Sequence, residues 1–253
     1  MIKPGSTLGI LGSGQLGRML AFSARQMGYR VHVYSSEPHS PAGAVADVEY
    51  VGAYDDVARV SEFARSVDVL TFEFENVAAE CAAAAEAVTL VRPAGRVLHI
   101  TQNRIREKSF LRDSGIPVTP FRPVHSADDL VGFTYPAVLK TAAFGYDGKG
   151  QQKVTSEAMA REAFAALPPQ PLILEEFIPF RREVSVVAGR SVDGEFFHFG
   201  VIENGHVITS SMSPGARSPW RARRLKSPGV SLTRWMSWES CASNFSRRPM
   251  AST

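Results

Sequence analysis

The stretch from residue 7 to residue 34 constrains the fold most strongly, because it joins two short apolar runs through a glycine-rich turn and a helix. Residues 7–11 are apolar, and residues 12–17 (Gly-Ser-Gly-Gln-Leu-Gly) follow with the spacing Gly-x-Gly-x-x-Gly. A helical pattern continues to Met27 and ends at Gly28, and residues 29–34 form the second run. This order of strand, glycine turn, helix and strand predicts a Rossmann-like α/β unit.

The glycine turn has two interpretations, because its spacing alone is a weak signal. A dinucleotide site needs an acid at the end of the second strand, and the only candidate there is Glu37, two residues beyond Ser35. The same turn can hold another phosphorylated ligand at the N-terminus of the helix. Both interpretations place an anionic ligand beside the turn.

A third strand is expected over residues 68–74, after a helix over residues 55–66. It ends in Glu73-Phe74-Glu75-Asn76. Polar groups at the carboxyl ends of parallel strands lie where open α/β sheets bind ligands. The alternative is a pair of solvated loop acids. A helix over 81–87, a strand over 89–91 and a helix over 101–115 follow.

Residues 137–151 carry the strongest chemical signal of the second half. An apolar strand over 137–141 contains Lys140, and the loop over 145–151 reads Gly-Tyr-Asp-Gly-Lys-Gly-Gln. Glycines let backbone N–H groups approach a phosphate, and Lys140 and Lys149 add positive charge. The alternative is a glycine-rich hairpin with solvated lysines.

The remaining elements suggest where an adenine ring would bind. Strands are expected over residues 118–124, 151–154, 172–178, 183–188 and 195–202, with a helix that Ser156 caps and that runs to residue 167. The strand over 172–178 contains Glu175 and Glu176, and Glu183 follows it. A strand backbone with acids nearby can bind adenine and ribose. An edge strand with outward acids is the alternative.

Composition excludes some classes of protein. The chain has 253 residues, two cysteines and a net charge of +3. Two cysteines are too few for a disulfide or zinc framework, no apolar run is long enough to span a membrane, and no signal-peptide pattern precedes the first strand. We therefore expect a cytoplasmic protein that binds neither membranes nor nucleic acid. The excess positive charge lies in residues 208–253, where eight Lys or Arg and one acid give a net charge of +7. Residues 1–207 therefore carry a net charge of −4.

Together, five motifs resemble a known family. They are residues 12–20, residues 71–77 (Thr-Phe-Glu-Phe-Glu-Asn-Val), residues 102–104 (Gln-Asn-Arg), residues 145–151 and residues 175–178 (Glu-Glu-Phe-Ile). In this order and spacing they are similar to N5-carboxyaminoimidazole ribonucleotide synthase, an ATP-grasp ligase of purine biosynthesis. The resemblance covers residues 5 to 206. It implies ATP and magnesium as cofactors, aminoimidazole ribonucleotide and bicarbonate as substrates, and a homodimer.

The resemblance also implies residue roles. ATP-contacting positions would be Arg104, Lys140, Gly145, Tyr146, Asp147, Gly148, Lys149, Gly150, Gln151, Glu175, Glu176, Phe177, Ile178, Glu183 and His206. Catalytic positions would be Lys140, Tyr146, Asp147 and Lys149. Gln15, Leu16 and Glu73 lie where related enzymes hold the ribonucleotide. Metal ligands would belong to a third domain that this chain lacks.

The resemblance stops after His206. The family continues with a segment that resembles His-x-x-His-Ile-Leu-Asp-x-Ser, whereas residues 208–213 read Ile-Thr-Ser-Ser-Met-Ser. One permitted codon choice for these six residues is ATC ACA TCC TCG ATG TCC. Preceded by C and read one base earlier, these codons encode His-His-Ile-Leu-Asp-Val. We therefore hypothesise a one-base frameshift near Val207.

The expected fold is ATP-grasp, α/β, with an N-terminal Rossmann-like domain and a truncated third domain. The predicted boundaries are 1–100 for the N-terminal domain, 101–190 for the central and lid domain, 191–207 for the start of the C-terminal domain and 208–253 for a disordered, aberrant tail. The missing part should leave an unpaired sheet edge and exposed apolar surface. Little turnover and poor stability are expected. Another ATP-grasp ligase, a nicotinamide-binding protein and a non-catalytic nucleotide-binding fragment are the alternatives.

Overall fold

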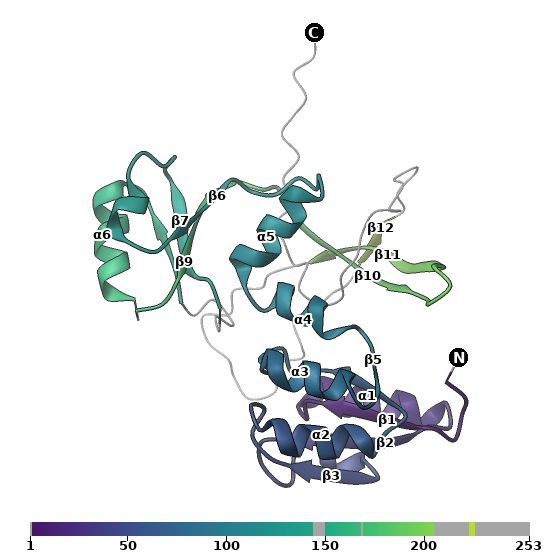
Figure 1. Cartoon of the computed structure of the whole chain (residues 1–253). Helices are drawn as coiled ribbons and strands as arrows, with labels where there is room; N and C mark the ends of the chain where they lie inside the picture. Colours follow the sequence, from purple (N-terminus) through teal and green to yellow (C-terminus); the bar gives the residue numbers. More distant parts are fainter. Residues whose placement is uncertain (1, 144–149, 168, 205–222, 226–253) are drawn as a thin grey trace, which may run out of the picture. The chain divides into compact units, whose positions relative to one another are not determined.

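A computed structural model describes residues 2–143, 150–167, 169–204 and 223–225 of the chain, with backbone only for the last three. It divides into two compact units, Met1–Glu107 and Lys108–Thr253 (Figure 1). Each unit has its own sheets and its own core.

The first unit is a five-stranded parallel sheet in the order β3-β2-β1-β4-β5. Its elements are β1 (Thr7–Leu11), α1 (Gln15–Gln26), β2 (Arg30–Ser35), a 3-10 turn (Gly43–Val45), β3 (Val48–Val51), α2 (Val57–Arg65), β4 (Val69–Phe72), α3 (Ala79–Glu86), β5 (Leu90–Val91) and α4 (Gly95–Thr101). The predicted Rossmann-like fold is confirmed. The sequence did not predict β3 and α4, because β3 is a short edge strand with no run of buried residues and α4 has only seven residues.

Helices cover both faces of this sheet, and the alternation of side chains along each strand shows how. Ile10 and Val33 pack with Ala21 and Ala24 of α1. The next residues along the strands, Leu11 and Tyr34, belong instead to the core with Val60 and Phe63 of α2 and Cys81 of α3. Because successive strand residues point to opposite faces, α1 lies on one face and α2 and α3 lie on the other (Figure 1).

The second unit contains two antiparallel sheets, in the orders β6-β9-β7-β8 and β10-β11-β12. Helix α5 (Arg104–Asp113) spans the boundary between the units, and the elements after it are β6 (Phe121–Val124), a 3-10 turn (Ala127–Leu130), β7 (Ala137–Thr141), β8 (Gln151–Val154), α6 (Glu157–Ala166), β9 (Leu172–Glu176), β10 (Glu183–Arg190), β11 (Phe196–Asn204) and β12 (Arg223–Leu225). The bounds of β7 and β8 agree with the sequence prediction.

Helix α6 covers one face of the four-stranded sheet (Figure 1). Ala160 and Ala163 of α6 are buried against Leu139 of β7, Leu174 of β9 and Val154 of β8. Ser156 begins the helix by accepting a hydrogen bond from the backbone N–H of Met159 (3.3 Å), as its sequence position predicted. The opposite face of the sheet is therefore the one open to a ligand.

The β10–β11 hairpin exposes several large apolar side chains. Phe197 and Phe199 of β11 are 59% and 67% exposed. The expected unpaired edge is partly covered, because β12 pairs with residues 201–203 of β11. That strand lies in the segment after residue 207, for which the sequence predicted no strand. The rest of the predicted tail lies outside the described residues.

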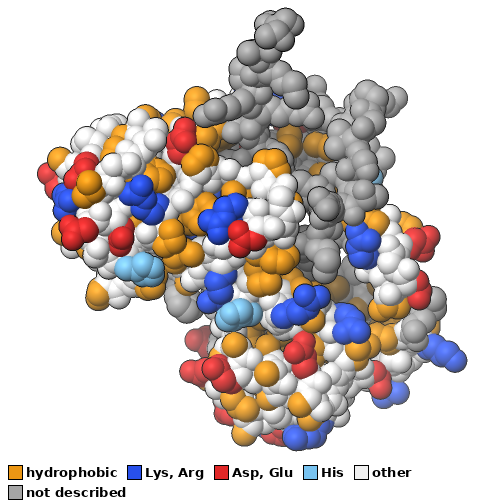
Figure 2. Space-filling view, turned by 45° about the horizontal axis from the view of Figure 1, so that its top comes forward, with side chains coloured by type: hydrophobic (Ala, Val, Ile, Leu, Met, Phe, Trp, Pro, Cys, Tyr) orange, Lys and Arg blue, Asp and Glu red, His pale blue; other side chains and the backbone are white. Residues whose placement is uncertain are grey.

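The described surface carries charges of both signs. On the face that Figure 2 shows, the side chains of Lys and Arg are interspersed with those of Asp and Glu. No helix within the described ranges is both long enough and apolar enough to cross a membrane.

Candidate functional site

The first unit offers a ligand crevice at the carboxyl ends of β1 and β4. The chain runs outward from β1 to β2 and β3 on one side, and to β4 and β5 on the other, so the strand order reverses between β1 and β4. Open α/β sheets bind ligands outside such a reversal. Gln15 and Leu16 follow β1, and Glu73 follows β4. The structure therefore brings these three predicted residues to the same edge of the sheet.

The glycine turn fits closely around Glu73. Gly12 has a φ of +125°, and a Cβ there would collide with the Glu73 carboxylate and the backbone N of Phe74. A Cβ on Gly14 would lie 3.1 Å from Glu73 Oε1. Only glycine at position 12 thus allows both this backbone conformation and the approach of Glu73.

Hydroxyl groups line the other side of this turn. Ser13 Oγ donates to Ser35 Oγ (2.8 Å), and β2 ends at this serine where a dinucleotide site would have an acid. The Tyr54 ring stacks on Phe74 with 4.5 Å between the ring centroids. Burial raises the pKa of Tyr54, so its hydroxyl remains a proton donor at neutral pH.

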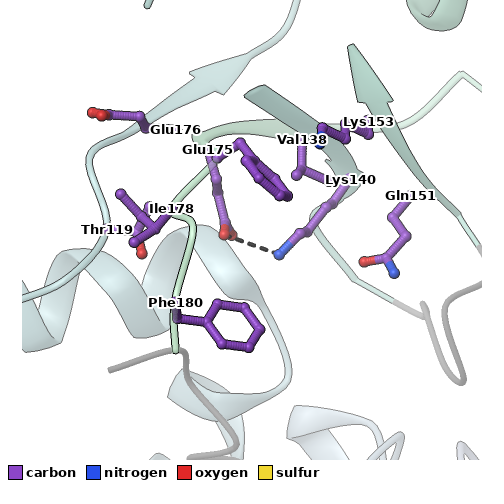
Figure 3. A pocket seen from close by; sticks show the side chains of 10 residues that line it. Thr119, Val138, Lys140, Gln151, Lys153, Glu175, Glu176, Ile178 and Phe180 are labelled. Carbon is purple, nitrogen blue, oxygen red and sulfur yellow. Dashed lines mark hydrogen bonds and ion pairs between the residues drawn. The ribbon is translucent and has the colours of Figure 1, made fainter. Parts of the chain in front are cut away.

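The second unit has a cleft of about 410 Å³ on the sheet face opposite α6. Strand alternation explains its lining. Leu139 and Leu174 face the core under α6, so Val138, Lys140 and Glu175, one residue away, face the cleft. The residues that line the cleft are Thr119, Val138, Lys140, Gln151, Lys153, Glu175, Glu176, Phe177, Ile178 and Phe180 (Figure 3). The volume is within the range typical of small-ligand sites.

The strongest charged contact of the cleft joins β7 to β9. Lys140 Nζ donates to Glu175 Oε2 at 2.9 Å, and Lys108 Nζ of α5 lies 3.5 Å from the same oxygen. The Glu175 side chain is 5% exposed, and those of Lys108 and Lys140 are 14% and 17% exposed. One buried carboxylate is thus neutralised by two lysines, which leaves the cluster with one excess positive charge.

The chain segment after β9 forms one wall of the cleft. The N–H of Glu176 donates to Pro120 O (3.0 Å), and the N–H of Phe177 donates to Pro136 O (2.9 Å). These bonds hold the segment in place on both sides. The Phe177 ring carries Lys153 Nζ 3.5 Å from its centroid, a cation–π contact. In Figure 3 the Glu176 carboxylate points away from the Lys140–Glu175 pair.

The cleft brings together many, though not all, of the predicted ATP-contacting residues. Those that line it are Lys140, Gln151, Glu175, Glu176, Phe177 and Ile178. Arg104 begins α5, and Glu183 begins β10, where its Oε1 accepts from Asn204 Nδ2 (3.0 Å). Gly150 has a φ of +72° and lies next to β8. The predicted positions Gly145, Tyr146, Asp147, Gly148, Lys149 and His206 lie outside the described residues.

Sequence reasoning missed Lys108, Lys153 and Phe180. Two of them had a usable signal. Lys108 is four residues after Arg104, so both lie on one side of a helix, and Lys153 is two residues after Gln151, so both lie on one face of a strand. Phe180 follows the end of β9 in a loop, where no periodicity places a side chain.

Comparisons with known proteins agree with this architecture. The family model "Ribonucleotide synthetase preATP-grasp domain" matches residues 5–102, and the model "ATP-grasp domain" matches residues 109–216. N5-carboxyaminoimidazole ribonucleotide synthase of Brucella melitensis is 40% identical over 240 residues, covering 91% of this chain and 66% of the relative.

Solved structures give the same result. A crystal structure of an N5-carboxyaminoimidazole ribonucleotide synthetase in complex with ADP has a TM-score of 0.77 and 42% identity, covering 82% of this chain and 56% of that one. The Aspergillus clavatus enzyme in complex with ADP and 5-aminoimidazole ribonucleotide has a TM-score of 0.73 and 27% identity, covering 81% of this chain and 55% of that one.

These matches also bear on where the resemblance ends. The chain spans 66% of the Brucella relative and little more than half of the two structures. The ATP-grasp match nevertheless continues to residue 216. An alignment over 91% of 253 residues includes about 230 of them, so it extends past His206 in that pair. With two domain models in order and 40% identity to named synthases, the chain belongs to the N5-carboxyaminoimidazole ribonucleotide synthase family of ATP-grasp ligases.

Proposed function

We propose that the chain carries the ATP-binding and ribonucleotide-binding parts of an enzyme that carboxylates 5-aminoimidazole ribonucleotide with ATP and bicarbonate. The observation that carries the proposal is the cleft on the open face of the β6-β9-β7-β8 sheet, which combines the Lys140–Glu175 pair with the strand-like segment Glu176 to Ile178. ADP, phosphate and N5-carboxyaminoimidazole ribonucleotide are the proposed products.

Adenine would bind along the segment after β9. The N–H groups of Glu176 and Phe177 are already used, whereas within the described residues the N–H of Ile178 donates no backbone hydrogen bond. It is therefore available to an acceptor nitrogen of the base. The apolar side chains of Val138 and Phe180 line the same cleft and would contact the ring faces. Glu183 would accept from the ribose hydroxyls, and Arg104 would complete the nucleotide contacts.

Lys140 would bind the phosphates. Its ammonium group supplies a point charge where negative charge is concentrated during phosphoryl transfer. Transfer of the γ-phosphoryl group to a bicarbonate oxygen would give carboxyphosphate and ADP. The exocyclic amine of the ribonucleotide then attacks the carbonyl carbon of carboxyphosphate, or carbon dioxide released from it. The new C–N bond forms, the C–O bond to phosphate breaks, and the amine loses one proton to solvent. Lys149 is proposed to add a second positive charge at the phosphates. The loop that contains Gly145, Tyr146, Asp147 and Gly148 is proposed to exclude water during these steps.

The ribonucleotide would bind at the first unit. Gln15 and Leu16 begin α1, whose N-cap Gly14 has no side-chain cap, so N–H groups of its first turn are oriented toward an incoming anion. Glu73 lies beside that turn and would accept from ribose hydroxyls. The Aspergillus clavatus enzyme, crystallised with both ADP and 5-aminoimidazole ribonucleotide, supports two separate ligands.

Magnesium does not fit the residues described. Among them, no three His, Cys, Asp or Glu side chains lie close enough together to bind a metal ion. After Asn204 the sequence contains only one acid, Glu239. We propose that the metal ligands of the family are missing from this sequence, that a frameshift near Val207 removed them, and that turnover by this chain is low.

The remaining proposals follow from the family. We propose a cytoplasmic homodimer that acts on small molecules and binds neither nucleic acid nor membranes. The domain boundaries predicted at residues 100, 190 and 207 remain part of this proposal.

Calorimetric titration of the purified chain with ATP tests the nucleotide-binding part. Micromolar to millimolar binding supports it, and no binding of ATP or ADP contradicts it. Hydrolysis of ATP that depends on both aminoimidazole ribonucleotide and bicarbonate would contradict the proposed low turnover. Hydrolysis that ignores the ribonucleotide would favour another ATP-grasp ligase. A rise in NADH fluorescence on titration would favour the nicotinamide-binding alternative.

Resequencing the codons for residues 206 to 213 tests the frameshift. Codons that read His-His-Ile-Leu-Asp-Val one base earlier support it, and codons that give no family-like reading in a shifted frame contradict it. A base restored on resequencing would make the tail an artefact, and the full enzyme should then be active.

A further inference from the structure

Two lysines from different elements share the buried carboxylate of Glu175. Lys140 belongs to β7 and Lys108 to α5, and both approach the same oxygen, Oε2, at 2.9 and 3.5 Å. An ordinary buried ion pair needs one cation, so the second lysine requires an explanation.

Without a nucleotide, Lys140 and Glu175 satisfy each other, and Lys108 stands at the longer distance. A polyphosphate in the cleft would compete with Glu175 for Lys140, because it presents several negative oxygens to the same ammonium group. If Lys140 turned to the phosphates with no second cation nearby, Glu175 would remain as an uncompensated buried charge. Leaving one partner of a buried pair without the other is strongly unfavourable.

The other charged groups around the cleft cannot take this role. Lys153 of β8 lies over the Phe177 ring, and the Glu176 carboxylate points away from the pair (Figure 3). The charged residues that line the cleft or contact Glu175 are Lys108, Lys140, Lys153 and Glu176, as far as the described residues go. Lys108 is the one that already contacts Glu175 from an element outside the sheet.

We infer that Lys108 is a positioning residue, which holds the charge of Glu175 when the nucleotide draws Lys140 to its phosphates. The inference rests on the proposed binding of ATP in this cleft. It assigns Glu175 two successive partners: chiefly Lys140 in the free protein and chiefly Lys108 in the nucleotide complex. The cost of freeing Lys140 is thereby lowered, and ATP binds more tightly than Lys140 alone would permit.

The test is the Lys108→Met variant of the full chain, titrated calorimetrically with ATP and with adenosine. We expect ATP affinity to fall by roughly tenfold to a hundredfold, because Lys140 must then leave Glu175 without a partner. Adenosine affinity should change less than about twofold, because adenosine does not compete for Lys140. A merely structural role of Lys108 would weaken both ligands together.

Three further variants sharpen the result. Lys108→Arg should restore most of the ATP affinity, since it keeps the charge. In a Glu175→Gln background, Lys108→Met should have little effect on ATP, because no carboxylate is left to neutralise. Arg112→Met removes a charge from the same helix without touching Glu175, and it should leave ATP affinity unchanged.

The outcomes separate this inference from the proposed function. A starting chain that binds no ATP overturns both. A starting chain that binds ATP, with equal affinity in Lys108→Met, overturns the role of Lys108 alone. An equal loss of affinity for ATP and for adenosine would show a structural role of Lys108 and overturn the inference as well. If Lys108→Met does not fold, the Glu175→Gln background decides. A loss of ATP affinity when Lys108→Met is added to Glu175→Gln would then overturn it.

Discussion

The glycine turn of the first unit and the cleft of the second unit both suit phosphorylated ligands, but they are built from different parts of the chain. The turn relies on backbone: Gly12 adopts a conformation that other residues rarely adopt, and α1 starts without a side-chain cap. The cleft relies on side chains, because Lys140, Glu175 and Lys108 supply the charge.

The two sites should therefore tolerate different amino-acid substitutions. A backbone site fails when a Cβ is added, whatever the charge of the new side chain. A charged site fails when a charge is removed, even if the shape is kept.

Lys140→Met should weaken ATP binding about a hundredfold, because it removes the phosphate-binding charge while Lys108 still neutralises Glu175. Isothermal titration with ATP measures this. Lys3→Met, an exposed lysine of the first unit, is the matched control and should bind ATP normally. Unchanged affinity in Lys140→Met would mean that the cleft does not rely on charge.

Gly12→Ala should lower the free energy of unfolding by about 2–3 kcal/mol, because alanine is strained at a φ of +125° and its Cβ meets Glu73. Urea unfolding followed by circular dichroism measures it. Gly115→Ala is the control: its φ is +74° and no atom lies within 4 Å of the added Cβ. About 1 kcal/mol is expected there. Equal losses would show that the approach of Glu73 contributes nothing.

Ser156→Ala should cost about 1 kcal/mol of stability, because α6 loses its N-terminal cap. Urea unfolding again provides the measurement. Ser109→Ala, in the interior of α5, should be close to neutral since alanine is the better helix former. A neutral Ser156→Ala would indicate that α6, like α1, does not depend on a side-chain cap.

Asp47→Asn should remove a small, pH-dependent part of the stability of the first unit. Hydrogen bonds from the Val31 N–H (2.7 Å) and from Arg25 (2.6 Å) hold the pKa of Asp47 below its usual value. A carboxyl whose pKa is lower in the folded state stabilises the fold above its unfolded pKa, and this stabilisation is lost as pH falls through the folded pKa.

At neutral pH the difference between the original chain and Asp47→Asn should be about 1 kcal/mol or less, since the pair is partly exposed. Thermal melting between pH 7 and pH 3 measures it, and the difference should shrink below about pH 4. A difference that stays constant down to pH 3 would refute the role of the ionised carboxylate.

Sequence patterns predicted elements best where the apolar period was strong. The strand over 137–141 and the strand over 7–11 have runs of apolar residues, and both have the predicted bounds. The edge strand β3 escaped prediction because its residues are only partly buried and no apolar run marks it. The parallel order of the sheet followed from the glycine turn and the helix after it.

The sequence could predict which residues belong to the candidate site, but not which of them contact one another. Lys140 and Glu175 were singled out, but their 2.9 Å contact depends on the antiparallel pairing of β7 with β9, which no local pattern encodes. The contribution of Lys108 requires α5 to lie over the same sheet face. Such long-range contacts are set by tertiary packing, so sequence periodicity could suggest the face of each residue but not its partner.

The alternation along β7 has one more consequence. Leu139 lies in the core and Lys140 lies in the cleft, and a strand shifted by one residue would exchange them. Misregistered chains would then bury an ammonium group under α6 and expose a leucine, and they would be unstable. The stable register of β7 is therefore also the one in which Lys140, the proposed phosphate-binding lysine, faces the cleft.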